Sequence, residues 1–323
     1  MKRMYLRCAG FLALLVLVLA AVSWIFYPKD NQDIGERQDR LSTGLLAEEK
    51  NSVDVLFLGD SLPMYSTVSI QIWGDYGIPC YTYATPQQNM VKTRRMTLDA
   101  LRIQSPKVIL LETNTLYREF SSQEVTADFF YELVPAARYH DNWKRVPLSR
   151  MIAPIRYEAQ QSSKGYYLTM HQCPPPITLR NYMEYNDLET EPQSTAVELL
   201  KDIWKRCKKD GIRLVLYSVP NFKSWSNGRH QIIAALAREM NIPYLDLNVQ
   251  KLDINWETDS LDHGDHLNYL GARKVTAYLG QWLWNTDLFT DKRADPAYAH
   301  WNQQYERFSG HAAEALDTGL IPE

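Results

Sequence analysis

The hydrophobic and polar positions of this chain alternate in blocks that predict a succession of strands and helices. Short apolar runs bounded by turn residues are typical of buried strands, and apolar residues three and four positions apart are typical of amphipathic helices. The pattern predicts five strands, at residues 52–58, 78–84, 107–113, 212–220 and 242–248. It predicts core helices at residues 89–104, 194–211, 229–241 and 268–285, with Asn268 as the N-cap of the last one.

Strands that alternate with helices predict a three-layer α/β domain over residues 51–290, built on a mainly five-stranded parallel sheet. Ligands of such sheets bind at the carboxyl ends of the strands. Residues 116–194 interrupt the rhythm and are too long for a simple crossover, so we interpret them as an inserted cap beside the site. The alternative is a looped crossover without substrate contact. The tail, 291–323, is polar and helix-prone, and we assign it no function.

The N-terminal residues carry a different pattern. Residues 8–27 hold no charged side chain, and a helix of this length at about 1.5 Å per residue spans about 30 Å, the hydrocarbon thickness of a bilayer. Lys2, Arg3 and Arg7 precede it, so the positive-inside rule predicts a cytoplasmic segment 1–7. We expect a single-pass cell-membrane anchor, a polar stalk at 28–50 and an extracytoplasmic C-terminal domain.

A cleaved signal peptide is the alternative to the anchor. The apolar run is long for a signal peptide, and no clean small-x-small cleavage motif follows it. In either case the rest of the chain is expected outside the cytoplasm, where ATP and free nucleotides are lacking.

Composition and charge exclude several classes of function. The formal net charge of −3 leaves no basic surplus for nucleic acid. The four cysteines form no CxxC pair, which makes a zinc ribbon or redox motif improbable. Neither GxxxxGK[ST] nor GxGxxG occurs, so kinases and dehydrogenases are disfavoured, and we predict no cofactor.

Two short motifs carry candidate chemistry. "DVLFLGDS" places Ser61 directly after the first predicted strand, and "DHGDHLN" places His266 just before the last core helix. A serine nucleophile needs a base within hydrogen-bond reach, an acid that orients the base, and donors for the oxyanion. Asp262 and Asp265 are the acids near His266.

In this order and placement the two motifs resemble the SGNH (GDSL) hydrolase superfamily over roughly residues 50–285. The layout is similar to its membrane-anchored extracytoplasmic branch, which includes teichoic-acid D-alanyl transfer proteins and cell-surface polysaccharide O-acyltransferases. The resemblance implies a flavodoxin-like fold, with Ser61 as nucleophile and oxyanion donor and His266 as base. The family's acid lies three positions before the base, where this chain has His263, so we prefer Asp262, with Asp265 as the alternative.

The other site residues depart further from the family pattern. The family's Gly after strand two is missing from "YATPQQN", where Thr85 and Gln88 could replace the Gly donor. Asn114 in "LLETNTLYR" is the candidate for the Asn donor. The predicted oxyanion hole is thus Ser61, Asn114 and Thr85, and Gln88 is also a candidate for substrate binding. For Asp60 we expect only a hydrogen bond to its own turn.

His140, in "RYHDNW", is the second candidate for substrate binding. It could contact a polymer or ligand from within the insert. A packed surface histidine is an equally good interpretation.

Metal binding is a rival interpretation of the second motif. Four potential ligands fall within five residues, and three further ones could fold nearby: Asp262, His263, Asp265 and His266, then Asp60, His140 and Asp259. We rank the triad ahead because it also explains Ser61, and we predict no metal.

The sequence therefore predicts a cell-surface serine esterase or O-acyltransferase that acts on acyl or acetyl esters of a wall or surface polysaccharide. The expected partners are an acylated polysaccharide or teichoic acid and a membrane-bound O-acyltransferase. The alternative is a non-catalytic protein of the same fold that binds the acylated polymer and presents it to the membrane enzyme.

Overall fold

The computed structural model describes residues 1–34, 39–144, 146–176, 182–185 and 191–319. The chain divides into two compact units. The anchor unit comprises Met1–Gly35 and Phe120–Ala159, and the sheet unit comprises Glu36–Glu119 and Gln160–Glu323.

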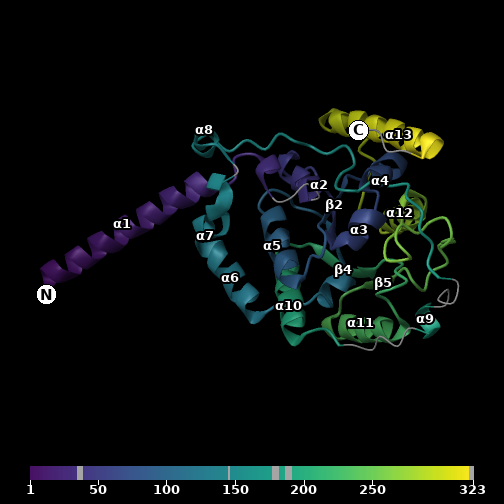
Figure 1. Ribbon diagram of the computed structural model, residues 1–323, viewed down its shortest axis with the longest axis horizontal. Coiled ribbons are helices and arrows are strands. Elements are labelled where there is room, and N and C mark those ends of the chain that lie inside the picture. Colours follow the sequence, from purple (N-terminus) through teal and green to yellow (C-terminus); the bar gives the residue numbers. More distant parts are fainter. Residues whose placement is uncertain (35–38, 145, 177–181, 186–190, 320–323) are drawn as a thin grey trace. The chain divides into compact units, whose positions relative to one another are not determined.

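The sheet unit is built on five parallel strands in the order β2-β1-β3-β4-β5 (Figure 1). This is the flavodoxin-like, doubly wound order, so the predicted fold class is confirmed. Four strands lie within their predicted ranges, and β1 extends one residue beyond its range: β1 (Val55–Gly59), β2 (Cys80–Ala84), β3 (Val108–Glu112), β4 (Arg213–Ser218) and β5 (Tyr244–Asp246).

Helices cover both faces of this sheet. Strands that are buried on both faces read as continuous apolar runs, and every residue of β1, β2 and β3 is buried. Figure 1 shows α5 and α10 on one side of the sheet and α4 and α12 on the other. The bounds of the main helices are α4 (Ser69–Tyr76), α5 (Met90–Ala100), α10 (Ser194–Lys209), α11 (Asn227–Met240) and α12 (Tyr269–Trp284).

Local capping explains where the predicted helices begin. The Asn89 side chain accepts a hydrogen bond from the Lys92 N–H and starts α5. Asn268 accepts from the N–H groups of Leu270 and Gly271, and so is the N-cap of α12 as predicted. These caps satisfy backbone donors that a helix end leaves without partners.

Shorter elements that the periodicity did not reveal complete the sheet unit. They are α2 (Asp39–Thr43), η2 (Gly44–Ala47), α3 (Ser61–Ser66), η3 (Thr113–Leu116), α9 (Tyr182–Tyr185) and η6 (Pro296–Tyr298). The tail forms α13 (Ala299–Thr318), whose buried Trp301 packs on Trp73 of α4 at 5.4 Å between ring centroids. The tail is therefore part of the sheet unit.

The structure divides the segment predicted as a stalk, residues 28–50. Residues up to 35 belong to the anchor unit, and the following ones belong to the sheet unit. The hydroxyl of Tyr81 on β2 donates to the Leu41 carbonyl at 2.8 Å. Glu48 forms a fully buried ion pair with Lys164 at 2.7 Å, and burial lowers the Lys164 pKa to about 8. Residues 39–50 are thus packed structure and not an extended linker, and 35–38 lie outside the described residues.

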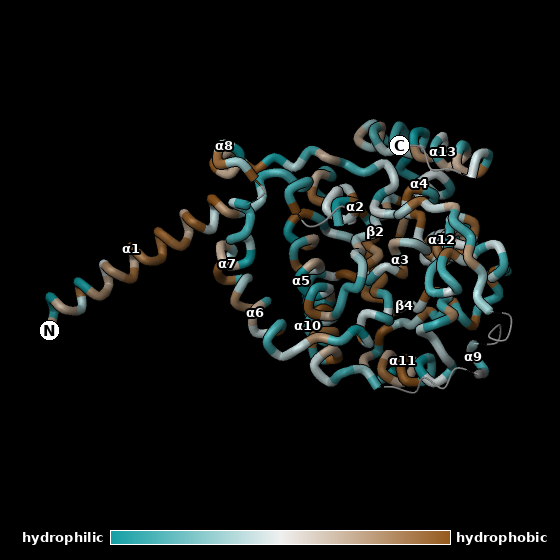
Figure 2. The backbone as a smooth tube through the Cα atoms, viewed as in Figure 1, coloured by the Kyte–Doolittle hydropathy of each residue, from teal (hydrophilic) through white to brown (hydrophobic). Residues whose placement is uncertain are grey.

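The anchor unit joins the apolar N-terminal helix to part of the predicted insert. Its elements are α1 (Lys2–Phe26), η1 (Asn31–Asp33), α6 (Ser122–Leu133), α7 (Pro135–Tyr139), η4 (His140–Lys144) and α8 (Leu148–Met151). Among the described residues, α1 is the one helix long and apolar enough to cross a membrane, and a signal sequence would meet the same test. Figure 2 colours most of α1 as hydrophobic.

The predicted insert, 116–194, is therefore divided between the anchor unit and the sheet unit. Residues 120–159 belong with α1, and the rest belongs to the sheet unit. Of this remainder, residues 177–181 and 186–190 lie outside the described residues.

Candidate active site

The fold places Ser61 at the carboxyl end of a central strand. β1 ends at Gly59, and Asp60 is the N-cap of α3, whose first residue is Ser61. A Cβ atom at position 59 would lie 2.5 Å from Pro63 Cγ and 2.8 Å from Glu112 Cβ, so only glycine fits at this close approach. The backbone N–H of Ser61 is at a helix N-terminus, where donors lack intrahelical partners.

Ser61, His266 and Asp262 form a continuous hydrogen-bonded chain. His266 Nε2 lies 2.7 Å from Ser61 Oγ, although the two residues are 205 positions apart. His266 Nδ1 lies 2.7 Å from Asp262 Oδ2, and the His266 backbone N–H donates to Asp262 Oδ1 at 2.7 Å. With the proton on Nδ1, Nε2 is free to accept the serine proton. The geometry is that of a nucleophile, a base and an orienting acid.

Asp262 contacts the His266 imidazole, whereas the Asp265 carboxylate contacts Asn221. Partial burial opposes ionisation of the Asp262 carboxyl, but the hydrogen bonds and charge of His266 outweigh it and lower the Asp262 pKa. The carboxylate of Asp265 instead accepts from Asn221 Nδ2 at 3.3 Å. The fallback assignment of Asp265 as triad acid therefore differs from the geometry.

The loop that carries the acid and base is a tight turn that accommodates their four-residue spacing. Ser260 and Leu267 pair as an antiparallel bridge. Between them, His263 and Gly264 adopt left-handed backbone conformations, with φ of 62° and 87°. A Cβ atom at position 264 would lie 2.5 Å from Phe222 Cβ. Two of the three residues between Asp262 and His266 are therefore left-handed.

Side chains that the sequence did not single out hold this loop in place. The buried Asn221, after β4, donates from Nδ2 to the Asp265 carbonyl at 2.9 Å, and Lys223 Nζ donates to the Asp262 carbonyl at 2.8 Å. The ring of Tyr65, on α3, packs on the His266 imidazole at 4.9 Å between centroids. Nothing local in the sequence marks these residues, because each acts through a contact distant along the chain.

Asp60 does more than cap its own turn. Its Oδ1 accepts from the Leu62 N–H at 2.9 Å, the turn bond that was expected. Its Oδ2 accepts from Asn114 Nδ2 at 2.9 Å and from Arg118 Nε at 2.8 Å. The carboxylate is fully buried, whereas the Arg118 side chain is 34% exposed. Asp60 therefore fixes an amide and a guanidinium beside the nucleophile, and Arg118 is a site residue that the sequence analysis missed.

Glu112 holds the backbone of Asn114 in place. Glu112 Oε2 accepts from the Asn114 backbone N–H at 2.9 Å, and its side chain is fully buried at the end of β3. Burial, reinforced by the charge of Asp60, raises the Glu112 pKa well above its ordinary value. Glu112 therefore holds its proton to a higher pH than an exposed glutamate does.

Thr85 and Gln88 are occupied by contacts within the chain. The Thr85 N–H donates to the Gly59 carbonyl at 3.4 Å, and its hydroxyl donates to Gln88 Oε1 at 3.0 Å. Gln88 is fully buried and donates from Nε2 to Thr93 Oγ1 at 3.0 Å. Thr85 thus has no spare donor for an oxyanion, and Gln88 has no exposed atom for a substrate.

His140 lies in the anchor unit, on η4. Its ring is exposed, with Nδ1 2.8 Å from the Ala137 carbonyl and Nε2 3.5 Å from Asp141. Its substrate-binding role stays a prediction.

The predicted metal ligands come together only in part. Asp262, Asp265 and His266 offer ligand atoms within 4.8 Å of one another. Both Asp262 oxygens and both His266 ring nitrogens already have partners in the triad chain. Asp259 instead forms an ion pair with Lys274 at 2.8 Å. A metal ion that used a His266 ring nitrogen would have to break the hydrogen bond to Ser61 or to Asp262.

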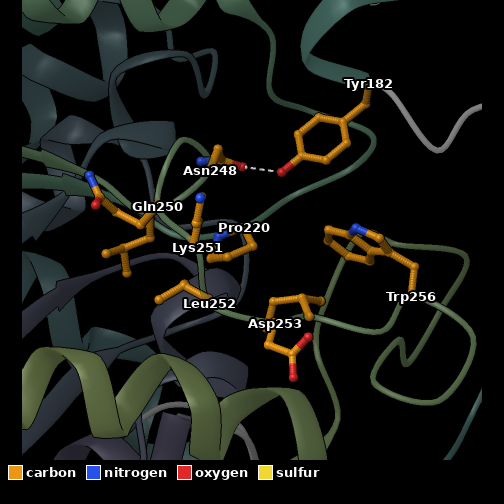
Figure 3. Close-up of a pocket in the computed structure, with 10 residues that line it drawn as sticks. Tyr182, Pro220, Asn248, Gln250, Lys251, Leu252, Asp253 and Trp256 are labelled. Atoms are coloured by element: carbon orange, nitrogen blue, oxygen red, sulfur yellow. Dashed lines mark hydrogen bonds between the residues drawn. The ribbon is translucent and has the colours of Figure 1, made fainter.

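A pocket of about 460 Å³ lies beyond the ends of β4 and β5 (Figure 3). Its lining combines aromatic rings with amide and charged groups, including Tyr182, Asn248, Gln250, Lys251 and Trp256. The Tyr182 hydroxyl donates to Asn248 Oδ1 at 2.8 Å. The pocket wall connects to the loop between Ser260 and Leu267 through Phe222, whose ring lies 5.5 Å from that of Trp256 and whose N–H donates to the Gly264 carbonyl.

Comparison with known proteins gives distant structural similarity. No protein-family model and no curated protein matches the sequence. A GDSL-like lipase from Bacteroides thetaiotaomicron is similar at 11% identity and a TM-score of 0.40, over 77% of this chain and 98% of that one. An acetyl xylan esterase is similar at 12% identity and a TM-score of 0.39, over 72% and 99% of the two chains. Similarity this low has no bearing on the reaction, which has to be inferred from the side chains at the site.

Proposed function

We propose that this protein is a serine ester hydrolase or O-acyltransferase of the SGNH type, with Ser61, His266 and Asp262 as its catalytic triad. The observation that carries the proposal is the unbroken chain of 2.7 Å contacts from Ser61 Oγ through His266 to Asp262. A buried serine joined to an imidazole that is itself oriented by a carboxylate is the arrangement that activates a hydroxyl nucleophile.

The reaction follows from this geometry in two halves. Ser61 Oγ attacks the acyl carbonyl while His266 Nε2 takes the serine proton. The tetrahedral intermediate collapses to an acyl-Ser61 ester, and His266 returns the proton to the departing alcohol. In the second half His266 takes a proton from water or from a sugar hydroxyl, the oxygen attacks the acyl carbon, and Ser61 is released with its proton restored.

We assign the oxyanion hole to the Ser61 backbone N–H and the side-chain amide of Asn114. Asn114 Nδ2 has two hydrogens, and Asp60 accepts one of them. The Arg118 guanidinium neutralises the buried Asp60 carboxylate, which would otherwise oppose negative charge developing next to it. Each donor of this kind is typically worth about 10²–10³-fold in kcat.

Acyl esters of a polysaccharide are the proposed substrates, and a sugar hydroxyl is the proposed acceptor when acyl transfer prevails over hydrolysis. The pocket beside the catalytic loop supports this class, because Trp256 and Tyr182 offer ring faces and Asn248 and Gln250 offer amides. Sugars are bound by this combination of apolar ring faces and amide hydrogen bonds.

For localisation we propose that α1 anchors the chain in the cell membrane and that the sheet unit lies outside the cytoplasm. The length and apolar character of α1 support a membrane span, and the basic residues Lys2, Arg3 and Arg7 support its orientation. An anchored enzyme would meet lipid-linked or wall polymers, including teichoic acid. It could also receive acyl groups from a membrane-bound O-acyltransferase.

Turnover of a chromogenic acetyl ester by the full chain in detergent tests the proposed activity. The expected result is turnover by the wild type and by Ser122→Ala, whose hydroxyl lies on α6, and loss of turnover in Ser61→Ala. An acetylated oligosaccharide offered with a second sugar then separates hydrolysis from transfer. Equal turnover by Ser61→Ala would overturn the mechanism. Polymer binding without any turnover would favour the non-catalytic partner.

A further inference from the structure

Exposed apolar side chains are concentrated in one part of the anchor unit. The comparison leaves α1 aside. The described residues of the sheet unit include four large exposed apolar side chains: Val249, Trp284, Leu288 and Leu316. The much shorter segment 129–155 has seven: Phe129, Phe130, Leu133, Trp143, Leu148, Ile152 and Ile155. We call these seven residues the apolar patch. Concentration on this scale marks an interaction surface, because scattered single residues are the normal case.

The apolar patch is not a loosely packed core. Leu133 is 82% exposed, Leu148 69% and Trp143 62%, while Asp128, Asn142 and Met151 on the same elements are buried. The elements therefore have an inner face that packs and an outer face that is apolar. An outer face of this kind needs an occupant other than water.

The elements of the patch are fixed to the end of α1. The Ala136 N–H donates to Ser23 Oγ at 3.1 Å, and Asn142 Nδ2 donates to the Phe26 carbonyl at 2.9 Å. The rings of Tyr27 and Tyr139 pack edge to face at 5.4 Å. In Figure 1, α6 and α7 run across the direction of α1 at this end. A helix that spans a bilayer ends at the headgroup level, so these contacts hold α7 and its neighbours at the same level.

The chemistry of the segment suits a phospholipid surface. Tryptophan and other apolar side chains favour the boundary between headgroups and acyl chains, and amphipathic helices lie there with their apolar face buried. Residues 122–151, from the start of α6 to the end of α8, contain four Lys or Arg and four acidic residues, so the apolar side chains and not a net charge favour this surface. Lys144 Nζ, which pairs with Asp141 at 2.7 Å, lies 5.8 Å from the centre of the Trp143 ring.

We infer that the apolar patch is a membrane-surface platform, in which α6, α7, η4 and α8 lie on the phospholipid bilayer where α1 emerges. The inference rests on the proposed membrane anchor and adds a second contact with the lipid. It replaces the cap role expected for residues 120–159. A single span alone leaves the chain free to tilt and rotate, whereas a platform limits the orientations that the anchor unit can take.

Photo-crosslinking tests the platform in the full chain, reconstituted in nanodiscs of phosphatidylcholine and phosphatidylglycerol. The photoreactive residue p-benzoylphenylalanine is placed singly at Leu133, Leu148 or Tyr131, and at Leu15 in α1. Tyr131 is the control on the same helix, because it is two positions from both Phe129 and Leu133 and is less exposed than either, although its ring lies 6.3 Å from that of Phe130. Lipid adducts are identified by mass spectrometry.

The expected result is lipid adducts at Leu15, Leu133 and Leu148, with at least tenfold fewer at Tyr131. Adducts at Leu15 without any at Leu133 and Leu148 would overturn the platform and leave the anchor standing. Adducts from Leu133 or Leu148 to a second protein copy would also overturn it, since they identify a protein partner. Absence of lipid adducts at all four positions would overturn the anchor and the platform together.

Discussion

The Asp262 carboxylate meets the His266 imidazole at 2.7 Å across a spacing of four residues, with His263 and Gly264 both in left-handed conformations between them. This contact supplies the orienting acid that a neutral imidazole base needs. Asp262→Asn is expected to lower kcat by roughly 10²–10⁴-fold, because the amide favours the wrong imidazole tautomer. Steady-state kinetics on an acetyl ester measures the loss. Asp265→Asn is the matched control and should stay within a few-fold of wild type; the reverse ranking would refute Asp262 as the acid.

The left-handed turn at Gly264 should be intolerant of a side chain. Gly264→Ala adds a Cβ atom within 2.5 Å of Phe222 Cβ, on a φ of 87°. We expect the loop to shift, so that kcat falls at least tenfold. Gly211→Ala is the control, because Gly211 has a φ of 73° but open space around its Cβ position. That variant should lose about 1 kcal/mol of stability and keep its kcat. Equal kcat in both variants would count against the strained loop.

Arg118 and Asp60 should behave as a coupled pair. Arg118→Ala leaves the buried Asp60 carboxylate without its cation, which we expect to cost roughly 1–3 kcal/mol of unfolding free energy and to lower kcat about tenfold or more. Adding Asp60→Asn removes the stranded charge and should recover most of the stability. Urea unfolding of the two single variants and the double variant measures the coupling.

The control for this cycle is Arg102→Ala, which breaks an exposed ion pair with Asp99. Such pairs are worth about 0–1 kcal/mol. Additive effects of Arg118→Ala and Asp60→Asn would show that the guanidinium does not neutralise Asp60.

Glu112 should make the sheet unit less stable at high pH. Burial, then the charge of Asp60, raises its folded-state pKa well above the ordinary 4.5, so the native state holds a proton that the unfolded state releases. The stability that protonated Glu112 contributes is complete below its ordinary pKa of 4.5. It is lost as pH rises toward the folded-state pKa. Each pH unit in that window costs up to about 1.4 kcal/mol. Glu112→Gln, a neutral isostere, removes this dependence.

Urea unfolding at about pH 5 and about pH 8 compares the two proteins. Glu112→Gln should gain stability relative to wild type as pH rises. A difference that is the same at both pH values would contradict a protonated Glu112.

The sequence predicts the strands well because their signals are local. Apolar runs mark strands that are buried on both faces, and a serine after the first strand lies at the sheet edge where the base is also delivered. Arg118, Tyr65 and Asn221 carry no local signal, since each acts through a partner more than 40 positions away in the chain.

The division of residues 116–194 could not be predicted for a related reason. The apolar residues of α6 and α8 look the same in a sequence whether they build a core or remain exposed. Residues 120–159 belong to the anchor unit, where Ala136 and Asn142 donate hydrogen bonds to Ser23 and Phe26 of α1. Likewise, the polar composition of 39–50 suggested a linker, but the Tyr81 and Lys164 contacts make it packed structure.

Active-site labelling with a fluorophosphonate is the most direct test of the central claim. The reagent forms a covalent phosphonate ester only with a serine whose hydroxyl is activated by a base. We predict a label on wild type, located at Ser61 by mass spectrometry, that is absent in Ser61→Ala and much slower to form in His266→Gln. No label on wild type under conditions that label a known serine esterase, or a label on another residue that persists in Ser61→Ala, would contradict Ser61 as the nucleophile.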